Sequence, residues 1–557
     1  MPNIELRNWQ FEATEKCLNW FTKTNKNKHF VINAAPGAGK TICASVIAAK
    51  LIENGDIDRV IIIAPRAEVV RQWAEEFHFV TQRHMSRITG VDADIESYGV
   101  DLCATWSAIA NLQDGFQRVC SSSKTLVICD EHHHAAVAAA WGAGADGAFK
   151  DAKYTLVLTG TPMRSDGNET VWLAFDDKGQ INQPSDGMYT LSYGEAVGLG
   201  YCRPVAFHRH EGQFTVSCAG GPGIRVSSNG NTEIPENLKN IRGLKQAVDF
   251  YKLACTRKYL RDNVTPDLNS YQATLLKHGI EKLNEQRLTI PNAGGLVIAP
   301  NIEMAEYMAE ILEKLEGERP TIVHSNLTNS EQRIAAFRNT SQKWIVSVAM
   351  ISEGVDIKRL RVMVYLPNAR TELAFRQAVG RVVRSLGKKD MSSAYVIMPI
   401  LKTLETYAKR IEDEMGPMAN KPLQKPTSKV CPSCENECAL TDKECPECGH
   451  EFPEPKKQYM TCDSCGALNP ISNDKCDSCG TSFKTEFTIE LRDAYRDGII
   501  TRGMELTNDE AIAGEKLDPS LDKDILSSGQ ETLIALWSQI PPSAKAKFIN
   551  LVNQPRD

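Results

Sequence analysis

The sequence predicts an α/β fold in which two successive lobes, each with a parallel sheet, precede two small cysteine-rich units. Two observations predict the lobes: apolar β-branched runs alternate with helix-like segments over residues 30–158, and the alternation returns over residues 296–398. Strands that alternate with helices form a parallel sheet covered on both faces. The third observation is a cysteine pattern that occurs twice between residues 431 and 483.

Length and composition restrict the class of protein. A chain of 557 residues exceeds the about 250–300 residues at which single cores stop growing, so it should hold several domains. Its first ten residues lack the apolar run of a signal peptide, and no apolar stretch reaches the roughly 18–20 residues that span a bilayer. We therefore expect a soluble, cytoplasmic protein with no membrane contact. The net charge of −6 argues neither for nor against nucleic acid, because local basic groups can hold phosphates.

Composition shifts along the chain indicate how it divides into regions. Between the lobes, alternating residues around a Gly-Gly-Pro-Gly turn at 213–231 predict a β-hairpin, and apolar residues at helical spacing follow over 238–251. The predicted regions are lobe one over 1–207, the inter-lobe insert over 208–292, lobe two over 293–415, a linker over 416–430, the cysteine-rich units over 431–483 and a helical C-terminal region over 484–557.

A glycine-rich segment, residues 33–41, follows the first predicted strand and opens a helix. Its glycines let backbone N–H groups close around phosphate oxygens at the helix N-terminus. Lys40 should reach the β- and γ-phosphates, and the Thr41 hydroxyl should bind Mg²⁺. A chance glycine-rich turn is the alternative, but the strand, loop, Lys-Thr pair and helix all occur in register. We therefore predict an ATP site that includes Pro36, Gly37, Ala38, Gly39, Lys40 and Thr41.

Two adjacent acids, Asp130 and Glu131, end the apolar strand predicted at residues 126–129. Such a strand delivers carboxylates to the crevice at the carboxyl edge of a parallel sheet. Asp130 is predicted to hold Mg²⁺, and Glu131 to orient and deprotonate the attacking water. A solvated Asp-Glu turn is common, so the pair indicates ATP hydrolysis mainly because it follows the glycine-rich segment.

In this order the motifs resemble those of the superfamily 2 helicases and translocases with a DExH box. That branch includes RadD-like repair proteins, UvsW-like phage helicases and restriction-enzyme translocase subunits. The resemblance covers about residues 5–400 and implies two RecA-like lobes. It also implies that Arg7 and Gln10 form the adenine-reading segment, with Gln10 bonded to the base. Residues 159–162 would couple the state of the ATP site to the nucleic-acid site. The acidic box departs from the usual pattern at His132, a position that is usually small.

The resemblance assigns further nucleotide contacts to lobe two. Gly354 and Asp356 fall in a motif that contacts the nucleotide, and Gln377, Arg381 and Arg384 fall in the last motif of the series. Arginines three residues apart lie on one face of a helix. Facing lobe one across a cleft, they can stabilise charge on the transferring phosphoryl group. The resemblance implies that Arg384 is the arginine finger, with Arg381 beside it. Gln377 and His133 are expected to contact each other or the γ-phosphate.

Nucleic acid is expected to cross the tops of both lobes. The resemblance implies contacts from Arg66, Thr105 and His324. The insert adds a basic segment, residues 239–261, with seven lysines and arginines against one aspartate. On a helix such a stripe can follow a phosphate backbone, although a solvated helix face is equally compatible with it. The candidate contacts in this segment are Lys252, Arg257, Lys258 and Arg261.

The cysteine-rich region consists of two units of identical spacing, offset by 31 residues, in which two CxxC pairs are separated by ten residues. Paired CxxC turns present four thiolates to one tetrahedral metal ion, which predicts two structural Zn²⁺ ions in tandem zinc ribbons. A redox CxxC would be a single pair near a βαβ unit. Cys438 and His450 are surplus and are not expected to be ligands. The predicted ligands are Cys431, Cys434, Cys445 and Cys448, then Cys462, Cys465, Cys476 and Cys479.

Together the motifs predict a nucleic-acid-stimulated ATPase. We interpret it as an ATP-dependent DNA helicase or translocase that moves on or remodels single-stranded, duplex or branched DNA. Repair, recombination, replication or phage–host conflict would need such a motor, and the acidic ribbons favour docking of a protein partner. An RNA helicase is one alternative. An ATP-independent scaffold is the other, but the intact Lys40, Asp130, Glu131, Arg381 and Arg384 argue against it.

Overall fold

The computed structural model describes most of both predicted lobes and parts of the region that follows them. The described residues are 4–22, 27–65, 67–88, 95–131, 140–160, 172–173, 181–182, 184–217, 223–228, 232–234, 248–324, 326–327, 329–348, 357–368, 370–385, 390, 392–415, 428–434, 436–452, 459–461, 467–470, 477–480 and 486–490.

Lobe one contains a seven-stranded parallel sheet in the order β3-β4-β2-β5-β6-β1-β7. Its central strands are apolar along almost their whole length, as strands covered on both faces are. Along β2, Val60 and Ile62 belong to one buried cluster and Ile61 and Ile63 to another, because successive side chains point to opposite faces. The strands are β1 (His29–Ala34), β2 (Arg59–Ala64), β3 (Met85–Ile88), β4 (Asp101–Thr105), β5 (Thr125–Asp130), β6 (Tyr154–Thr159) and β7 (Met188–Leu191).

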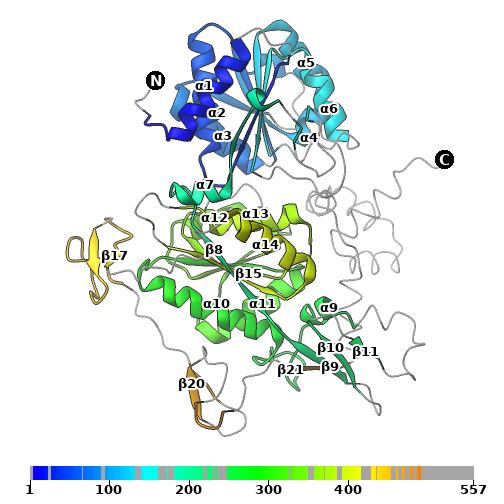
Figure 1. The fold of residues 1–557 in the computed structure, drawn as a ribbon, viewed down its shortest axis with the longest axis vertical. Coiled ribbons are helices and arrows are strands. Elements are labelled where there is room, and N and C mark those ends of the chain that lie inside the picture. The colour runs from blue at the N-terminus through cyan, green and yellow to red at the C-terminus, as the bar shows by residue number, and fades with distance from the viewer. Residues whose placement is uncertain are drawn as a thin grey trace, which may run out of the picture.

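Helices cover both faces of this sheet (Figure 1). Lys40 begins the helix that directly follows the glycine-rich loop, and buried residues run along this helix on nearly every side. The helices of lobe one are α1 (Asn8–Thr22), α2 (Lys40–Glu53), α3 (Ala67–Thr81), α4 (Trp106–Asn111), α5 (Gln113–Ser122) and α6 (Ala140–Phe149).

Lobe two contains a six-stranded parallel sheet in the order β13-β14-β12-β15-β16-β8. The predicted fold class of two tandem parallel-sheet lobes is therefore confirmed. The strands are β8 (Val205–His210), β12 (Gly294–Ile298), β13 (Thr321–Val323), β14 (Trp344–Ser347), β15 (Leu360–Tyr365) and β16 (Ala394–Pro399). The helices are α10 (Tyr271–Arg287), α11 (Ile302–Glu316), α12 (Ser330–Arg338), α13 (Glu372–Val382) and α14 (Lys402–Met415).

A short helix, α7 (Tyr193–Gly198), connects the two lobes (Figure 1). It begins with a capping box, in which the Ser192 hydroxyl accepts from the Glu195 N–H and the Glu195 carboxylate accepts from the Ser192 N–H. After α7 the chain enters β8, the edge strand next to β16 in the lobe-two sheet. The boundary predicted at residue 207 thus falls inside a strand of lobe two.

The insert contributes a small separate sheet in the order β11-β10-β9-β21. The hairpin predicted within residues 213–231 corresponds to β9 (Gln213–Ser217) and β10 (Ile224–Ser227), which pair antiparallel, and β11 (Thr232–Glu233) follows them. The fourth strand, β21 (Glu486–Glu490), pairs parallel with β9.

The start of the C-terminal region is therefore a strand at 486–490 and not the predicted helix. Phe487 explains why it docks there, since its ring lies 5.6 Å from that of Phe214 and 5.3 Å from that of Tyr271, measured between centroids. The prediction for residues 491–557 lies outside the described residues.

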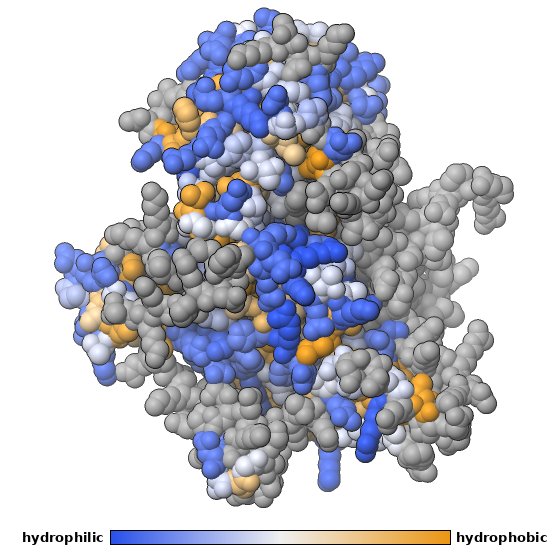
Figure 2. All heavy atoms as spheres, viewed as in Figure 1, coloured by the Kyte–Doolittle hydropathy of each residue, from blue (hydrophilic) through white to orange (hydrophobic). Residues whose placement is uncertain are grey.

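The cysteine-rich region forms two short antiparallel strand pairs, β17 (Ser428–Val430) with β18 (Glu437–Ala439), and β19 (Tyr459–Thr461) with β20 (Leu468–Pro470). In the view of Figure 2, hydrophilic residues cover most of the described surface and the apolar residues are scattered. Among the described residues, no helix has the length and apolar character that a membrane span needs.

Candidate functional site

The glycine-rich loop has the backbone that phosphate binding requires. Gly37 and Gly39 adopt φ values of +79° and +94°, a left-handed region that side-chain-bearing residues rarely enter. Lys40 Nζ donates to the Ala34 carbonyl at 3.0 Å across the loop. Gly160 follows β6 beside it, and a Cβ added there would lie 3.0 Å from Lys40 Nζ. The loop, Lys40 and the end of β6 therefore surround one position at the carboxyl edge of the sheet.

The two acids lie at the same edge, at the end of β5. Trp73 Nε1 donates to Asp130 Oδ2 at 2.8 Å, which fixes that carboxylate. Burial, and then the neighbouring Glu131 carboxylate, raise the pKa of Asp130 well above its ordinary value. Glu131 has a φ of +49°, an uncommon backbone conformation for a residue with a side chain and one that occurs often at functional sites. A desolvated carboxylate beside a second one is suited to a hard divalent cation, so the donor set fits Mg²⁺.

The predicted adenine-reading segment is bonded to the glycine-rich loop. Arg7 Nη1 and Trp9 Nε1 both donate to the Ala38 carbonyl, at 2.9 and 3.2 Å. Gln10 Nε2 donates to the Gly39 carbonyl at 2.9 Å, and Gln10 Oε1 accepts from the Arg7 N–H at 2.9 Å. Both ends of the Gln10 amide are thus used within the protein, and its contact with a base stays a prediction. Sequence reasoning missed the contribution of Trp9, although its indole among polar residues was a visible signal.

Lobe two meets this loop through the end of α13. Gln377 and Arg381 are buried on the helix, but the helix ends at Val382, so Arg384 lies beyond it. The prediction that both arginines share one helical face is therefore wrong, because Arg384 is instead held in an antiparallel bridge with Cys202. A Cβ added to Gly37 would lie only 2.8 Å from Arg384 Cγ. The side chain of the predicted finger therefore packs directly on the loop of lobe one.

A cavity of about 150 Å³ lies between the two lobes, beside the contact of Arg384 with Gly37. Lobe one lines it with the start of the glycine-rich loop and Gly160, and lobe two lines it with α13 and α14. At its wall, a Cβ added to Gly380 would lie 2.8 Å from Pro36 Cβ, so the two lobes are in van der Waals contact there.

The predicted nucleic-acid contacts are only partly described. Arg66 lies outside the described residues, and so do Gly354 and Asp356, which were predicted to contact the nucleotide. Thr105 caps α4, with its hydroxyl accepting from the Ala108 N–H at 3.2 Å. His324 follows β13 and is buried, and burial lowers the pKa of its imidazole, which favours the neutral form.

The predicted basic helix is shorter than the sequence suggests. Within the described residues it is α9 (Phe250–Ala254), so Lys252 is on a helix and Arg257, Lys258 and Arg261 follow it. Lys258 is paired with Asp267 at 2.9 Å. The prediction of a continuous basic helix over 239–261 is thus wrong beyond Ala254. The chain there forms a turn at 259–266, and Lys258 is held by Asp267.

Helix α9 is attached to lobe two by contacts that the sequence did not indicate. The Tyr251 hydroxyl donates to the Pro367 carbonyl just after β15, and the Arg370 guanidinium lies 4.9 Å from the centre of the Tyr251 ring. Helix α9 therefore lies at the carboxyl edge of the lobe-two sheet, which is also where His324 follows β13. Lys252 and Arg370 place basic groups at this edge.

The first cysteine unit brings four sulfur atoms together. Cys431 Sγ lies 3.6 Å from Cys448 Sγ, and Cys434 Sγ lies 3.6 Å from Cys445 Sγ. All four sulfurs lie within 4.8 Å of one another. Zn–S bonds of about 2.3 Å in a tetrahedron separate the sulfurs by roughly 3.8 Å, so the cluster fits zinc. Cys438 is buried nearby, 3.7 Å from Cys445, but is not one of the four.

In the second unit, Cys462, Cys465 and Cys476 lie outside the described residues, and Cys479 is exposed. Its zinc site stays a prediction that rests on the repeated spacing.

Elemental analysis is expected to find about two zinc ions per chain, because each closed four-thiolate site binds one ion. Cys431→Ser should remove one ion and Cys462→Ser the other. Cys438→Ser is the matched control and should keep both, since its sulfur is outside the group. A freshly purified wild type with fewer than two zinc ions would contradict the tandem sites.

Comparisons with known proteins agree with this arrangement. Residues 3–164 match the family model described as type III restriction enzyme, res subunit. Residues 279–385 match the helicase conserved C-terminal domain. An uncharacterized protein of Mycobacterium tuberculosis is 30% identical over 424 residues, which are 75% of this chain and 65% of that protein. The chain thus spans less than two thirds of that relative. The ATP-dependent RNA helicase DHX58 of Mus musculus is 26% identical over 143 residues, 24% of this chain and 20% of that protein.

The solved structures are less similar to this chain in sequence than these relatives are. The ATP-dependent type ISP restriction-modification enzyme LlaBIII bound to DNA has a TM-score of 0.47 at 16% identity, over 74% of this chain and 30% of that chain. Dbp5 of S. cerevisiae bound to RNA has a TM-score of 0.44 at 12% identity, over 74% and 92%.

The two family models match separate parts of the chain, and each match falls within one of the two parallel-sheet lobes. The glycine-rich loop and the acidic pair fall in the first match, and the buried Gln377 and Arg381 with Arg384 fall in the second. The chain therefore carries two helicase-family domains, one in each lobe, as the resemblance to the superfamily 2 helicases predicted.

Proposed function

We propose that this chain hydrolyses ATP in response to DNA and uses the hydrolysis to move along DNA or to separate its strands. The observation that carries the proposal is the contact between Arg384 and Gly37, because it joins the last motif of lobe two to the glycine-rich loop of lobe one. A site divided between two lobes can be opened and closed by a ligand that bridges them.

Each residue of the site has a separate task in the proposed reaction. Lys40 exchanges its bond with the Ala34 carbonyl for the γ-phosphate, and the hydroxyl of Thr41 and the carboxylate of Asp130 hold Mg²⁺, which neutralises phosphate charge when bound. Glu131 accepts the proton of the attacking water. The water oxygen bonds to the γ-phosphorus as the bond between this phosphorus and the bridging oxygen breaks, which yields ADP and phosphate. Arg384 stabilises the charge that develops during this step.

DNA is the favoured substrate because lobe one matches the family model of a restriction-enzyme subunit, and restriction enzymes act on DNA. RNA is the second candidate, favoured by the partial similarity to an RNA helicase. ATPase rates measured in parallel with single-stranded, duplex and forked DNA and with RNA test the choice. Stimulation by DNA above that by RNA supports the proposal, and stimulation by RNA alone would replace it. No stimulation by any nucleic acid would favour a scaffold.

The basic groups near the carboxyl edge of lobe two give a test of the DNA path. Lys252→Gln combined with Arg257→Gln should weaken DNA binding without changing ATP affinity. The plot of log affinity against log salt should become shallower by roughly 0.9 for each phosphate that the variant no longer neutralises, because fewer counterions are released on binding.

Arg319→Gln is the matched control for this pair. Arg319 precedes β13, at the opposite edge of the sheet, and pairs with Glu306 and Glu313. Its replacement should leave the slope as in the wild type. Equal slopes in the double variant and the wild type would remove these residues from the DNA path.

A further inference from the structure

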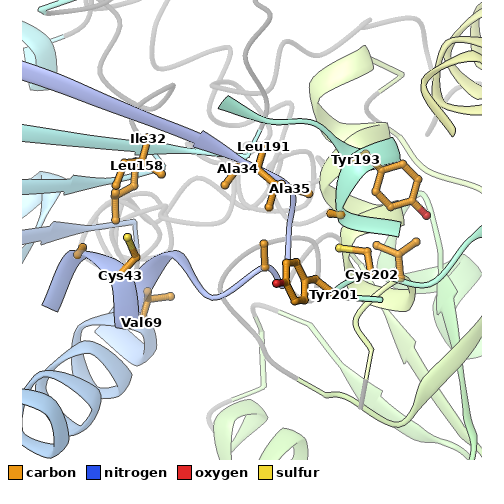
Figure 3. Close-up of a cluster of buried hydrophobic side chains, with 14 of the residues drawn as sticks. Ile32, Ala34, Ala35, Cys43, Val69, Leu158, Leu191, Tyr193, Tyr201 and Cys202 are labelled. Carbon is orange, nitrogen blue, oxygen red and sulfur yellow. The ribbon is translucent and has the colours of Figure 1, made fainter. Parts of the chain in front are cut away.

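Residues 201–203, a short distance after α7, contact the predicted adenine-reading segment, the glycine-rich loop and Arg384. The Arg7 guanidinium lies 4.6 Å from the centre of the Tyr201 ring, and Arg7 belongs to the predicted adenine-reading segment. Cys202 Sγ donates to the Pro36 carbonyl of the glycine-rich loop at 3.2 Å, and the Cys202 backbone bridges to Arg384. Figure 3 shows Tyr201 and Cys202 close to the loop residue Ala35.

The third residue, Arg203, is only 1% exposed, and the hydrogen bonds that its side chain makes with described residues all go to lobe two. Its backbone N–H donates to the Val383 carbonyl at 2.7 Å, and its Nη1 donates to the Val382 carbonyl at 2.6 Å. The last carbonyls of a helix have no partner within the helix and favour a cation. Arg203 therefore caps the C-terminus of α13, one residue before Arg384.

A buried ion pair fixes this cap. Arg203 Nε donates to Asp390 Oδ2 at 3.0 Å, and its two Nη atoms donate to the Leu360 and Lys358 carbonyls at 2.9 and 3.0 Å. Arg361 shares the same carboxylate at 3.2 Å and the same two carbonyls. Arg203 and Arg361 thus have almost the same surroundings. Among the described residues, Arg203 also contacts the carbonyls of Val382 and Val383 at the end of α13.

The contacts of this segment with the two lobes differ in kind. Toward lobe two they are a buried charge pair and a planar fork of hydrogen bonds, which fix geometry closely. Toward lobe one they are a cation–π contact and a thiol donor, which are weak and easily separated. Burial raises the pKa of Cys202 to about 12, so its sulfur is a thiol and can donate to Pro36. The segment should therefore move with lobe two when the cleft opens.

We infer that residues 201–203 position the arginine finger. Arg203 sets the end of α13 so that Arg384 reaches the glycine-rich loop, and Tyr201 and Cys202 hold lobe two in position against lobe one. The inference rests on the proposed ATPase function and adds Arg203 as its positioning residue. Arg203 itself does not touch the nucleotide.

Arg203→Lys tests the inference, with Arg361→Lys as the matched control. Lysine keeps the positive charge beside Asp390 but cannot reproduce the planar fork. We expect kcat for DNA-stimulated hydrolysis to fall by about 10²-fold in Arg203→Lys, the cost of a displacement of about 1 Å at a reacting centre. The KM for ATP and the melting temperature should stay close to those of Arg361→Lys, whose kcat should resemble the wild type. Equal losses of kcat in both variants would reduce Arg203 to a structural role.

Alkylation of Cys202 by a maleimide, read by peptide mass spectrometry, provides a measurement that needs no ATPase activity. The buried thiol should react slowly in the wild type, and Cys103 in the core of lobe one is the internal reference. Tyr201→Leu removes the contact with Arg7 and keeps every bond of Arg203, so it should speed the labelling of Cys202 alone.

The two measurements separate the possible failures. If the wild type hydrolyses no ATP with any nucleic acid, the proposed function fails, and the labelling still decides whether the segment registers the lobes. If Arg203→Lys does not fold, Tyr201→Leu alone decides. Unchanged Cys202 labelling in Tyr201→Leu would overturn the inference.

Discussion

Lys40→Ala is expected to abolish ATP turnover, and Glu131→Gln is expected to bind ATP normally but to hydrolyse it about 10²–10⁴-fold more slowly, the range for loss of a general base. In the structure Lys40 Nζ is already aimed across the glycine-rich loop at the Ala34 carbonyl, so a γ-phosphate needs only to replace that acceptor. Alanine leaves the phosphate without its cation, which weakens both binding and the chemical step.

Glu131 should act on the chemical step alone. Its neighbour Asp130 is held by Trp73 and is the carboxylate suited to the cation, whereas Glu131 follows at a positive φ and is half-buried. Glutamine keeps the size and removes the base. Binding of a fluorescent ATP analogue and multiple-turnover hydrolysis, measured on the same preparations, separate the two variants.

Lys50→Ala is the control for Lys40→Ala. Lys50 lies near the other end of the same helix, α2, and pairs with Glu15 at 3.0 Å on the surface. Such exposed pairs contribute at most about 1 kcal/mol, so this variant should retain wild-type turnover. An equal loss of ATP affinity in Lys40→Ala and Glu131→Gln would contradict the separate roles of the two residues.

Most of the two lobes could be predicted because their strands are buried on both faces. Such strands are short continuous apolar runs, and the runs at 126–129 and 322–323 correspond to β5 and β13. The positions of Lys40 and of the acidic pair follow from the same rule, since parallel strands end at one edge of a sheet.

The elements that were not predicted depend on partners distant in the sequence. In β21, Ile489 accepts from Ser217, 272 positions away, and the alternation of Phe487, Thr488 and Ile489 is too short to identify the sheet that the strand joins. Helix α9 ends at Ala254, and Lys258 beyond it pairs with Asp267, so a count of basic residues alone predicted too long a stripe.

The inter-lobe part of the site had the weakest sequence signal. Tyr201, Cys202 and Arg203 form no recognisable motif, and their importance depends on a backbone bridge to Arg384 that only the folded chain reveals. Helical spacing suggested that Arg381 and Arg384 act together, but α13 ends between them, because Arg203 satisfies its last carbonyls.

Arg384→Ala is expected to leave ATP binding nearly intact and to lower DNA-stimulated turnover by about 10³-fold or more, the usual effect of losing an arginine finger. The aliphatic part of Arg384 packs on Gly37, so its guanidinium is carried by lobe two to the edge of the phosphate loop. Lys40 and Glu131 belong to lobe one and remain in place. The charge that develops on the phosphoryl group would then lack its partner from lobe two.

Arg381→Ala is the informative comparison, because Arg381 is buried in the last turn of α13 and Arg384 lies beyond the helix. If Arg384 is the finger, its variant should lose kcat with an unchanged KM and an unchanged melting temperature. Arg381→Ala should instead lower the melting temperature, since a buried side chain is truncated. A variant of Arg384 that loses ATP affinity as strongly as it loses kcat/KM would show a ground-state contact, because a finger stabilises only the transition state.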